Sequence, residues 1–120
     1  MRSRLARQRV EILRRVGRSI RRVRDGDAEA VFRALGDPTR RHIIELLCDG
    51  DATVSFIAEP LPMSLAMVTR HVHALERRGL IRTHKIGRVR TCWLEPEALR
   101  LLEEWVRYQR SRWERHQRRV

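Results

Sequence analysis

The stretch MSLAMVTRHVHALERRGLIRTHKIGRVR, which spans residues 63–90, decides the fold of this chain. Ser64 is a favourable helix N-cap, and the fourteen residues after it contain neither Gly nor Pro. Apolar side chains recur there at spacings of three and four, which places them on one helical face: Leu65, Val68, Val72 and Leu75. The opposite face is polar around Arg70, and Gly79 ends the helix. The stretch therefore begins with an amphipathic helix.

A basic hairpin is predicted directly after this helix. Residues 80–84 and 89–94 are expected to form two short strands, and Gly87 is the turn residue between them. Lys85 and Arg88 add positive charge beside the turn. A polar-faced helix followed by a basic hairpin is typical of a winged helix-turn-helix. Such a helix fits a major groove about 12 Å wide, and the hairpin grips the backbone beside it.

The net charge of +12 is concentrated in two parts of the 120 residues. Residues 1–24 carry ten Arg and one Glu, and residues 63–90 carry seven Lys or Arg and one Glu. This concentration predicts a polyanion as the partner. An apolar content of 42% indicates one globular domain. The chain has no apolar run of about 18 residues and no signal-peptide core, so the expected compartment is the cytoplasm.

The N-terminal segment, residues 1–26, is predicted to be a basic arm. It precedes a DNA-binding and dimerisation domain at residues 27–118. Apolar residues recur at helical spacing within the arm, at Leu13, Val16, Ile20 and Val23. Three interpretations stay open for the arm: a solvated tail, a contact with the DNA backbone, and a role in a dimer.

Helices are also expected on both sides of the opening stretch. They are predicted at residues 28–35, after the cap Asp37 and Pro38, at residues 54–59, and after Pro96. Thr53 is expected to cap the short helix at 54–59, with Phe56 and Ile57 pointing inward. The predicted fold is mainly α within the α+β class, a winged helix-turn-helix of about five helices and a two-stranded hairpin wing.

Three blocks of sequence carry a resemblance to a known family: ALGDPTRR at residues 34–41, MSLAMVTRHV at 63–72 and LERRGLI at 75–81. In this order and spacing, over roughly residues 28–118, the chain resembles the ArsR/SmtB family of bacterial winged-helix repressors. The resemblance implies a homodimer whose seam is formed by the first and last helices, and a fourth helix that enters the major groove. One departure is Pro62, since many members have Gly there and proline cannot take a positive φ.

Under this interpretation the fourth helix and the hairpin supply the DNA contacts. Arg70 is expected to read a base edge, and guanine matches its bidentate fork. Ser64 and the helix N-terminus would hold phosphate, and the hairpin cations would grip backbone or minor groove. The predicted DNA-binding residues are Arg40, Ser64, Leu65, Ala66, Met67, Thr69, Arg70, His71, His73, Lys85, Arg88 and Arg90.

The last helix carries an apolar stripe that a small domain has little means of covering. Its members follow spacings of three and four from Leu99 to Trp113. The same helix of a second copy is the expected cover, and packing of Trp105 and Trp113 on their own core is the alternative. The predicted dimer-interface residues are Val31, Phe32, Leu99, Leu102, Trp105, Val106 and Trp113.

The metal sites known in the family lack their ligands in this chain. The positions that match the family's Cys-x-Cys are Thr53 and Ser55, and the last helix holds one His, His116, and no Asp. Zinc needs about four N, S or O ligands, so no metal and no cofactor are predicted. Cys48 and Cys92 leave a thiol-responsive variant open, although buried structural cysteines are the expected outcome.

The sequence predicts a homodimeric, sequence-specific regulator of double-stranded DNA, namely a repressor at an inverted-repeat operator. No nucleophile–base pair, Gly-rich phosphate loop or carboxylate pair at a motif spacing supports catalysis, so the chain is not expected to be an enzyme. Three alternatives stay open: a basic RNA-binding protein, a winged helix that binds only proteins, and a metal- or thiol-responsive variant of the same repressor.

Overall fold

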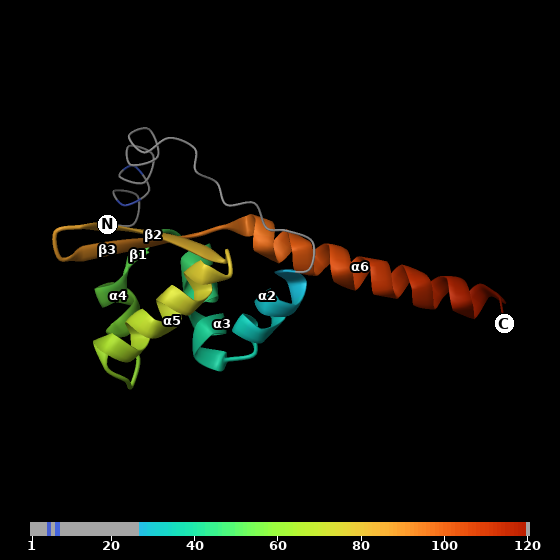
Figure 1. Cartoon of the computed structure of the whole chain (residues 1–120), viewed down its shortest axis with the longest axis horizontal. Helices are drawn as coiled ribbons and strands as arrows, with labels where there is room; N and C mark the ends of the chain where they lie inside the picture. Colours follow the sequence, from blue (N-terminus) through green and yellow to red (C-terminus); the bar gives the residue numbers. More distant parts are fainter. Residues whose placement is uncertain (1–4, 6, 8–26, 120) are drawn as a thin grey trace.

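The computed structural model describes residues 27–119 together with Leu5 and Arg7, so the predictions for the basic arm lie outside the described residues. The helices are α2 (Asp27–Leu35), α3 (Pro38–Cys48), α4 (Val54–Ala58), α5 (Leu65–Arg77) and α6 (Pro96–Arg119). The strands are β1 (Ala52–Thr53), β2 (Ile81–Ile86) and β3 (Val89–Leu94). In Figure 1 the helices α2 to α5 lie on one side of the sheet, the hairpin points away at one end, and α6 extends from the other. The predicted winged helix-turn-helix fold is confirmed.

The sheet has three antiparallel strands in the order β1-β3-β2, one more than the predicted hairpin. The additional strand β1 pairs Ala52 with Cys92. In the hairpin, β2 starts one residue later and ends two residues later than predicted, so that Ile86 pairs with Val89. The turn is therefore the two residues between them. Gly87 occupies its first position with φ 60°, which matches the Gly-first type II′ turn of tight hairpins.

Side-chain caps begin the helices where the sequence predicted them. The Asp37 carboxylate accepts hydrogen bonds from the amides of Thr39 and Arg40 at the start of α3. Thr53 caps α4 and Ser64 caps α5, each by accepting a hydrogen bond from the amide three residues further along the chain. Gly79 follows α5 with φ 77°, a left-handed conformation that glycine adopts without strain.

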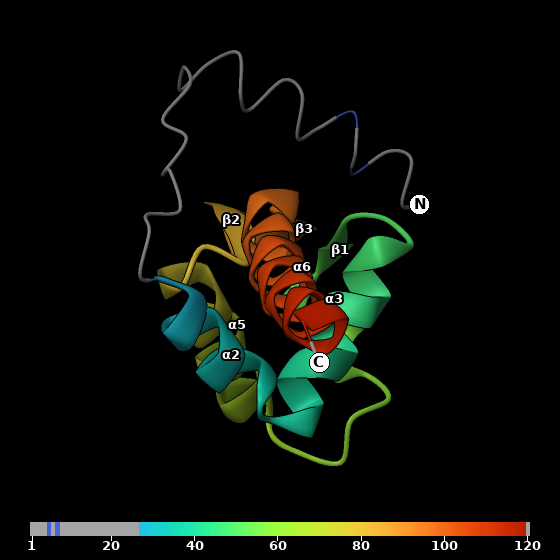
Figure 2. The same ribbon diagram turned by 90° about the vertical axis from the view of Figure 1, so that its right-hand side faces the viewer.

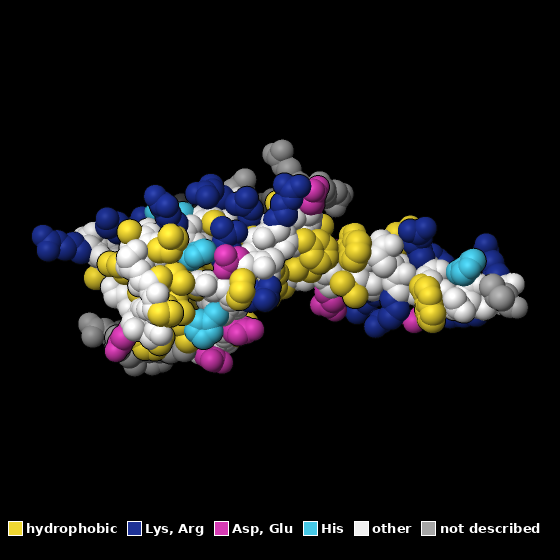
Figure 3. All heavy atoms as spheres, turned by 90° about the horizontal axis from the view of Figure 1, so that it is seen from below, with side chains coloured by type: hydrophobic (Ala, Val, Ile, Leu, Met, Phe, Trp, Pro, Cys, Tyr) yellow, Lys and Arg dark blue, Asp and Glu magenta, His cyan; other side chains and the backbone are white. Residues whose placement is uncertain are grey.

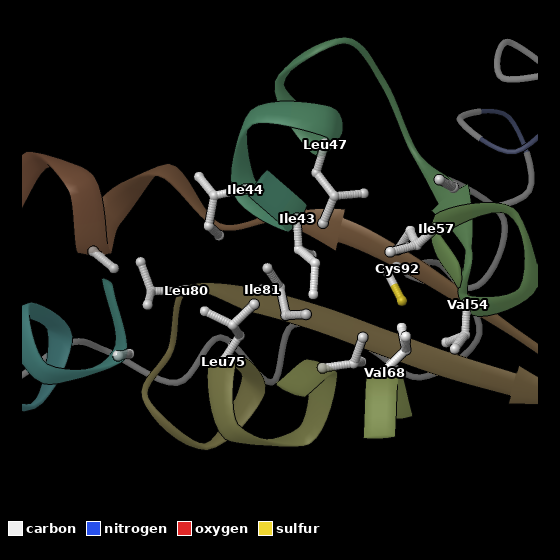
Figure 4. Packing of buried hydrophobic residues seen from close by; sticks show 14 of the residues in the cluster. Ile43, Ile44, Leu47, Val54, Ile57, Val68, Leu75, Leu80, Ile81 and Cys92 are labelled. Atoms are coloured by element: carbon white, nitrogen blue, oxygen red, sulfur yellow. The ribbon is translucent and has the colours of Figure 1, made fainter. Parts of the chain in front are cut away.

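Buried side chains from α3, α4, α5 and the hairpin strands meet in one core, as Figure 4 shows. Ile43, Ile57 and Leu75 have no exposed surface. One prediction about an inward-facing residue was wrong: Phe56 is 38% exposed. Leu65, which shares the apolar stripe of α5 and was predicted to contact DNA, is 54% exposed. Neighbouring positions on a helix point about 100° apart, so in the short α4 Ile57 takes the inward direction and Phe56 does not.

The helices α2 to α5 and the three strands form the body of the molecule. Helix α6 begins against this body and then continues beyond it. Ala98 is buried, and Leu99 and Leu102 pack against the core as half-buried side chains. Figure 2, which looks along α6, shows α2 to one side of this helix and α3 to the other. Within the residues that the structure describes, no helix combines the length and the apolar character needed to cross a membrane.

Candidate nucleic-acid interface

The outer face of α5 holds most of the residues predicted to bind DNA. Val68, Val72 and Leu75 anchor the inner face in the core. None of the predicted contact residues of this helix is buried: Leu65, Ala66, Met67 and Arg70 are exposed, and Thr69, His71 and His73 are half-buried. Arg70 is exposed, so its guanidinium lies on the solvent side of the helix, as base reading requires.

Two hydroxyl groups near the start of α5 already make hydrogen bonds within the helix. The Ser64 Oγ accepts from the amide of Met67 at 3.1 Å, so its own hydrogen stays available for donation to a phosphate. The Thr69 Oγ1 donates to the carbonyl of Leu65 at 2.9 Å. An oxygen in that state still accepts hydrogen bonds from a base.

The tip of the hairpin is exposed and basic. Lys85 and Arg88 are both exposed there, and Figure 3 shows Lys and Arg side chains at the hairpin end of the molecule. Ile86 and Val89, the pair that closes the turn, are about half-exposed. The tip therefore offers two cations beside a small apolar pair, a composition that suits a groove edge lined by phosphates and sugars.

Arg90 differs from the other predicted contacts, because its side chain is part of a network inside the protein. Its Nη1 donates to the Thr83 Oγ1 at 2.6 Å. The same hydroxyl lies 2.9 Å from the Glu76 Oε2, which also accepts the Thr83 amide at 2.8 Å. Glu76 belongs to α5 and Thr83 to β2. Arg90 is half-buried and helps to fix the base of the hairpin against α5, the helix predicted to enter the major groove and called the recognition helix below.

The first turn of α3 also meets α5. The Arg40 Nε donates to the His71 Nδ1 at 3.3 Å, and Asp37 caps the same turn. Partial desolvation acts to raise the pKa of Asp37, but the amide hydrogen bonds of Arg40 and Thr39, and then the charges of His71 and Arg40, bring the pKa below its ordinary value. The carboxylate is thus held ionised as a cap at this helix start.

The predicted dimer residues fall into two groups. Val31 has no exposed surface, so it packs in the core of its own chain and has no area to offer a partner, contrary to the expectation. Phe32 and Trp105 are 41% and 48% exposed and contact each other edge-to-face, with ring centroids 5.2 Å apart. Val106 is half-exposed and Trp113 is 63% exposed. Figure 3 shows hydrophobic side chains exposed along α6.

The positions matched in the sequence analysis to the family's Cys-x-Cys are not metal ligands in this chain. Thr53 caps α4, and Ser55 is exposed. In the described part of the chain, no three His, Cys, Asp or Glu residues are grouped so as to hold a metal ion. Cys48 is exposed, whereas Cys92 is buried. Burial, helped by the charges of Glu76 and Asp51, raises the pKa of Cys92 to about 12, so this thiol stays protonated and unreactive.

Sequence reasoning missed the hydrogen bonds that join the parts of this surface. Arg40 and His71 are 31 positions apart, and the Glu76–Thr83 bonds cross from a helix to a strand. No spacing rule connects such residues. The one available signal was that a Thr in a strand and a Glu at a helix end are both able to bond a neighbouring element.

Comparison with known proteins finds relatives that are helix-turn-helix transcriptional regulators. A family model described as a helix-turn-helix domain matches residues 35–84. The transcriptional repressor SdpR of Bacillus subtilis is 40% identical over 57 residues, which cover 48% of this chain and just 63% of SdpR. The uncharacterized HTH-type transcriptional regulator YuzN of Bacillus subtilis is 30% identical over 90 residues, which cover 68% of this chain and 98% of YuzN.

Solved structures agree with this result. The crystal structure of an ArsR family transcriptional regulator superposes with a TM-score of 0.72 at 46% identity, covering 73% of this chain and 97% of the other. A homodimeric winged helix-turn-helix DNA-binding domain from Mycobacterium bovis superposes with a TM-score of 0.57 at 24% identity, covering 76% of this chain and 85% of the other. The second likeness concerns the fold alone.

Proposed function

This chain belongs to the ArsR family of winged helix-turn-helix transcriptional regulators, and we propose that it is a homodimeric repressor of an inverted-repeat operator in duplex DNA. The observation that carries the proposal is the exposed outer face of α5 beside a basic hairpin tip. The repressor SdpR, which matches part of the chain, supports the direction of regulation. A regulator of this kind acts where the chromosomal DNA lies, so the proposed site of action is the cytoplasm.

In this proposal α5 enters the major groove and the hairpin tip contacts the adjacent backbone. Arg70 reads a guanine edge, a bidentate contact that contributes about 1–3 kcal/mol of discrimination. Met67, Thr69 and His73 lie on the same outer face and contact neighbouring bases or phosphates. Lys85 and Arg88 contact phosphates, which adds affinity without sequence preference. Arg90 acts from inside the protein, by holding the wing at its angle to α5.

The proposed dimer forms through α6 together with Phe32 of α2. The exposed stripe on α6 supplies apolar area for a partner, and the charges along the helix favour one direction of pairing. Its first half contains three Glu and one Arg, and its second half, from Arg107 to Arg119, contains six Arg and one Glu. Two copies laid antiparallel bring unlike halves together. The Mycobacterium bovis neighbour, which is a homodimer, supports this assembly.

Selection of binding sites from randomised duplexes tests this proposal directly. We expect the selected sites to be inverted repeats, with half-sites about 34–36 Å apart or a multiple of that distance, as twofold symmetry requires. Sedimentation of the free protein should give a dimer. Unselected RNA competitor should displace the operator poorly. A monomer in solution, selected sites without palindromy, or displacement by RNA at equal concentration would each contradict the proposal.

A further inference from the structure

A hydrogen bond between Arg40 and His71 joins the first turn of α3 to the recognition helix. The Arg40 Nε lies 3.3 Å from the His71 Nδ1, and both side chains are half-buried. This bond uses one of the five N–H donors of the guanidinium, and the two terminal amino groups carry the other four. Arg40 therefore keeps the atoms that bind a phosphate while its stem is held against α5.

The helix start beside this pair is already satisfied by its own cap. Asp37 accepts the amides of Thr39 and Arg40, so those amides are committed to the carboxylate. An anion approaching this end of α3 consequently meets the Arg40 side chain as its donor group. The adjacent Arg41 differs, because its Nη1 donates to the Leu35 carbonyl at 2.7 Å and links α3 to the end of α2.

The ring of His71 accepts through Nδ1, which fixes its protonation state. A neutral imidazole has one acceptor nitrogen, whereas a protonated imidazole has hydrogen on both nitrogens and accepts no bond. The Arg40 bond therefore exists with neutral His71, whose hydrogen is on Nε2. The bond is lost when His71 gains a second proton.

We propose that His71 is a positioning residue, which holds Arg40 as a preformed phosphate clamp beside the recognition helix. This inference rests on the proposed duplex binding and adds to it a specific role for His71. A free arginine side chain must be ordered when it meets a phosphate, and an arginine already tethered by Nε loses less freedom at that moment. The recognition helix and the start of α3 then grip the duplex as one unit.

A double-mutant cycle on binding to a mixed-sequence duplex of about 30 base pairs tests the clamp, because phosphate contacts do not depend on sequence. We expect His71→Leu to weaken binding about 2- to 10-fold at pH 8 and Arg40→Ala to weaken it at least as much. Arg40→Ala should cost much less in the His71→Leu background. His71→Asn retains an acceptor near the position of Nδ1 and should restore most of the affinity.

Arg41→Ala is the matched control. It removes the same charge at the neighbouring position, and the Arg41 side chain bonds to the Leu35 carbonyl and not to His71. Its penalty should be equal in the wild-type and His71→Leu backgrounds. Equal penalties for Arg40→Ala in the two backgrounds, or no rescue by Asn, would overturn the inference. If the wild type binds no duplex, the proposed function fails as a whole. If it binds but shows no coupling, only the clamp fails.

Discussion

The body and helix α6 differ in the exposure of their apolar side chains. In the body, Ile43, Ile57 and Leu75 have no exposed surface and meet in one core. Of the 24 residues of α6, Ala98 is the buried one, while Trp105 and Trp113 are largely exposed. The core is thus closed by the body together with the start of α6, and the rest of α6 presents apolar area that the described residues leave exposed.

This difference separates two kinds of residue. Side chains in the body should determine whether a single chain folds, and under the proposed assembly side chains on the α6 stripe should determine whether two chains associate. The proposed DNA-binding face belongs to the body, since α5 is anchored there by Val68, Val72 and Leu75. Substitutions in the two regions should therefore change different measurements, which makes the comparison testable.

The largest expected effect is a loss of folding stability from a substitution in the body. Leu75→Ala should lower the free energy of unfolding by about 2–5 kcal/mol, because it leaves a cavity in a fully buried site. Denaturant unfolding at one fixed protein concentration measures this, since a dimer's stability depends on concentration. A loss below about 1 kcal/mol would mean that the core is looser than the structure shows.

A substitution on the α6 stripe should act on association instead. Trp113→Ala should weaken the dimer by about 2 kcal/mol, the scale of an interface hot spot, and leave the helical content of the folded chain unchanged. Sedimentation over a range of concentrations measures the dissociation constant. Tyr108→Ala is the matched control, because Tyr108 is an exposed aromatic whose direction on the helix lies about 140° from that of Trp113. Equal weakening by both variants would place the seam elsewhere.

The sequence correctly predicted the structural features that depend on residues close together in the chain. The Ser64 and Asp37 caps, the left-handed Gly79 and the Gly87 turn are local signals, and each lies in the structure where the pattern put it. Helical periodicity likewise identified the buried face of α5. None of the predicted contact residues of α5 is buried, although Thr69, His71 and His73 are only partly exposed, and their contacts with DNA stay a prediction.

The features that sequence reasoning missed depend on residues far apart in the chain. Strand β1 is two residues long, too short for an alternating pattern, and it exists because Ala52 meets Cys92. Val31 has the periodic position of an interface residue, yet the packing of other elements around it encloses it. The Arg90 side chain has the charge of a DNA contact, yet Thr83 holds it inside the wing. In each case tertiary packing overrides the local signal.

Within the body, the recognition helix and the hairpin tip should respond differently to loss of a charge. Arg70→Ala should cost about 1–3 kcal/mol on the operator and much less on random duplex, because it removes a base contact. Arg88→Ala should weaken binding to both duplexes alike and reduce the slope of log affinity against log salt by about one. Neither substitution should change dimerisation, since both residues lie away from α6. Parallel losses on both duplexes for Arg70→Ala would remove its base-reading role.

The smallest expected effects are losses in the free energy of unfolding from substitutions at the N-termini of α3 and α6. Asp37→Ala should lower the free energy of unfolding by about 0.5–2 kcal/mol, because the carboxylate accepts two amides. Glu97→Ala, in the exposed first turn of α6, removes the same charge and should cost a few tenths of a kcal/mol. Chemical unfolding of the two variants at the same protein concentration measures the difference.

The pH dependence of the Asp37 effect has a definite sign. The pKa of Asp37 is lowered in the folded chain, so ionised Asp37 stabilises the fold fully above its unfolded pKa, which is about 3.9. That stability is lost as the pH falls through the lowered folded value. The gap between wild type and Asp37→Ala should therefore be widest near neutral pH and narrow in acid. Asp37→Asn, which keeps a capping oxygen but cannot ionise, should lose this dependence, and a gap that widens in acid would show that charge at Asp37 opposes the fold.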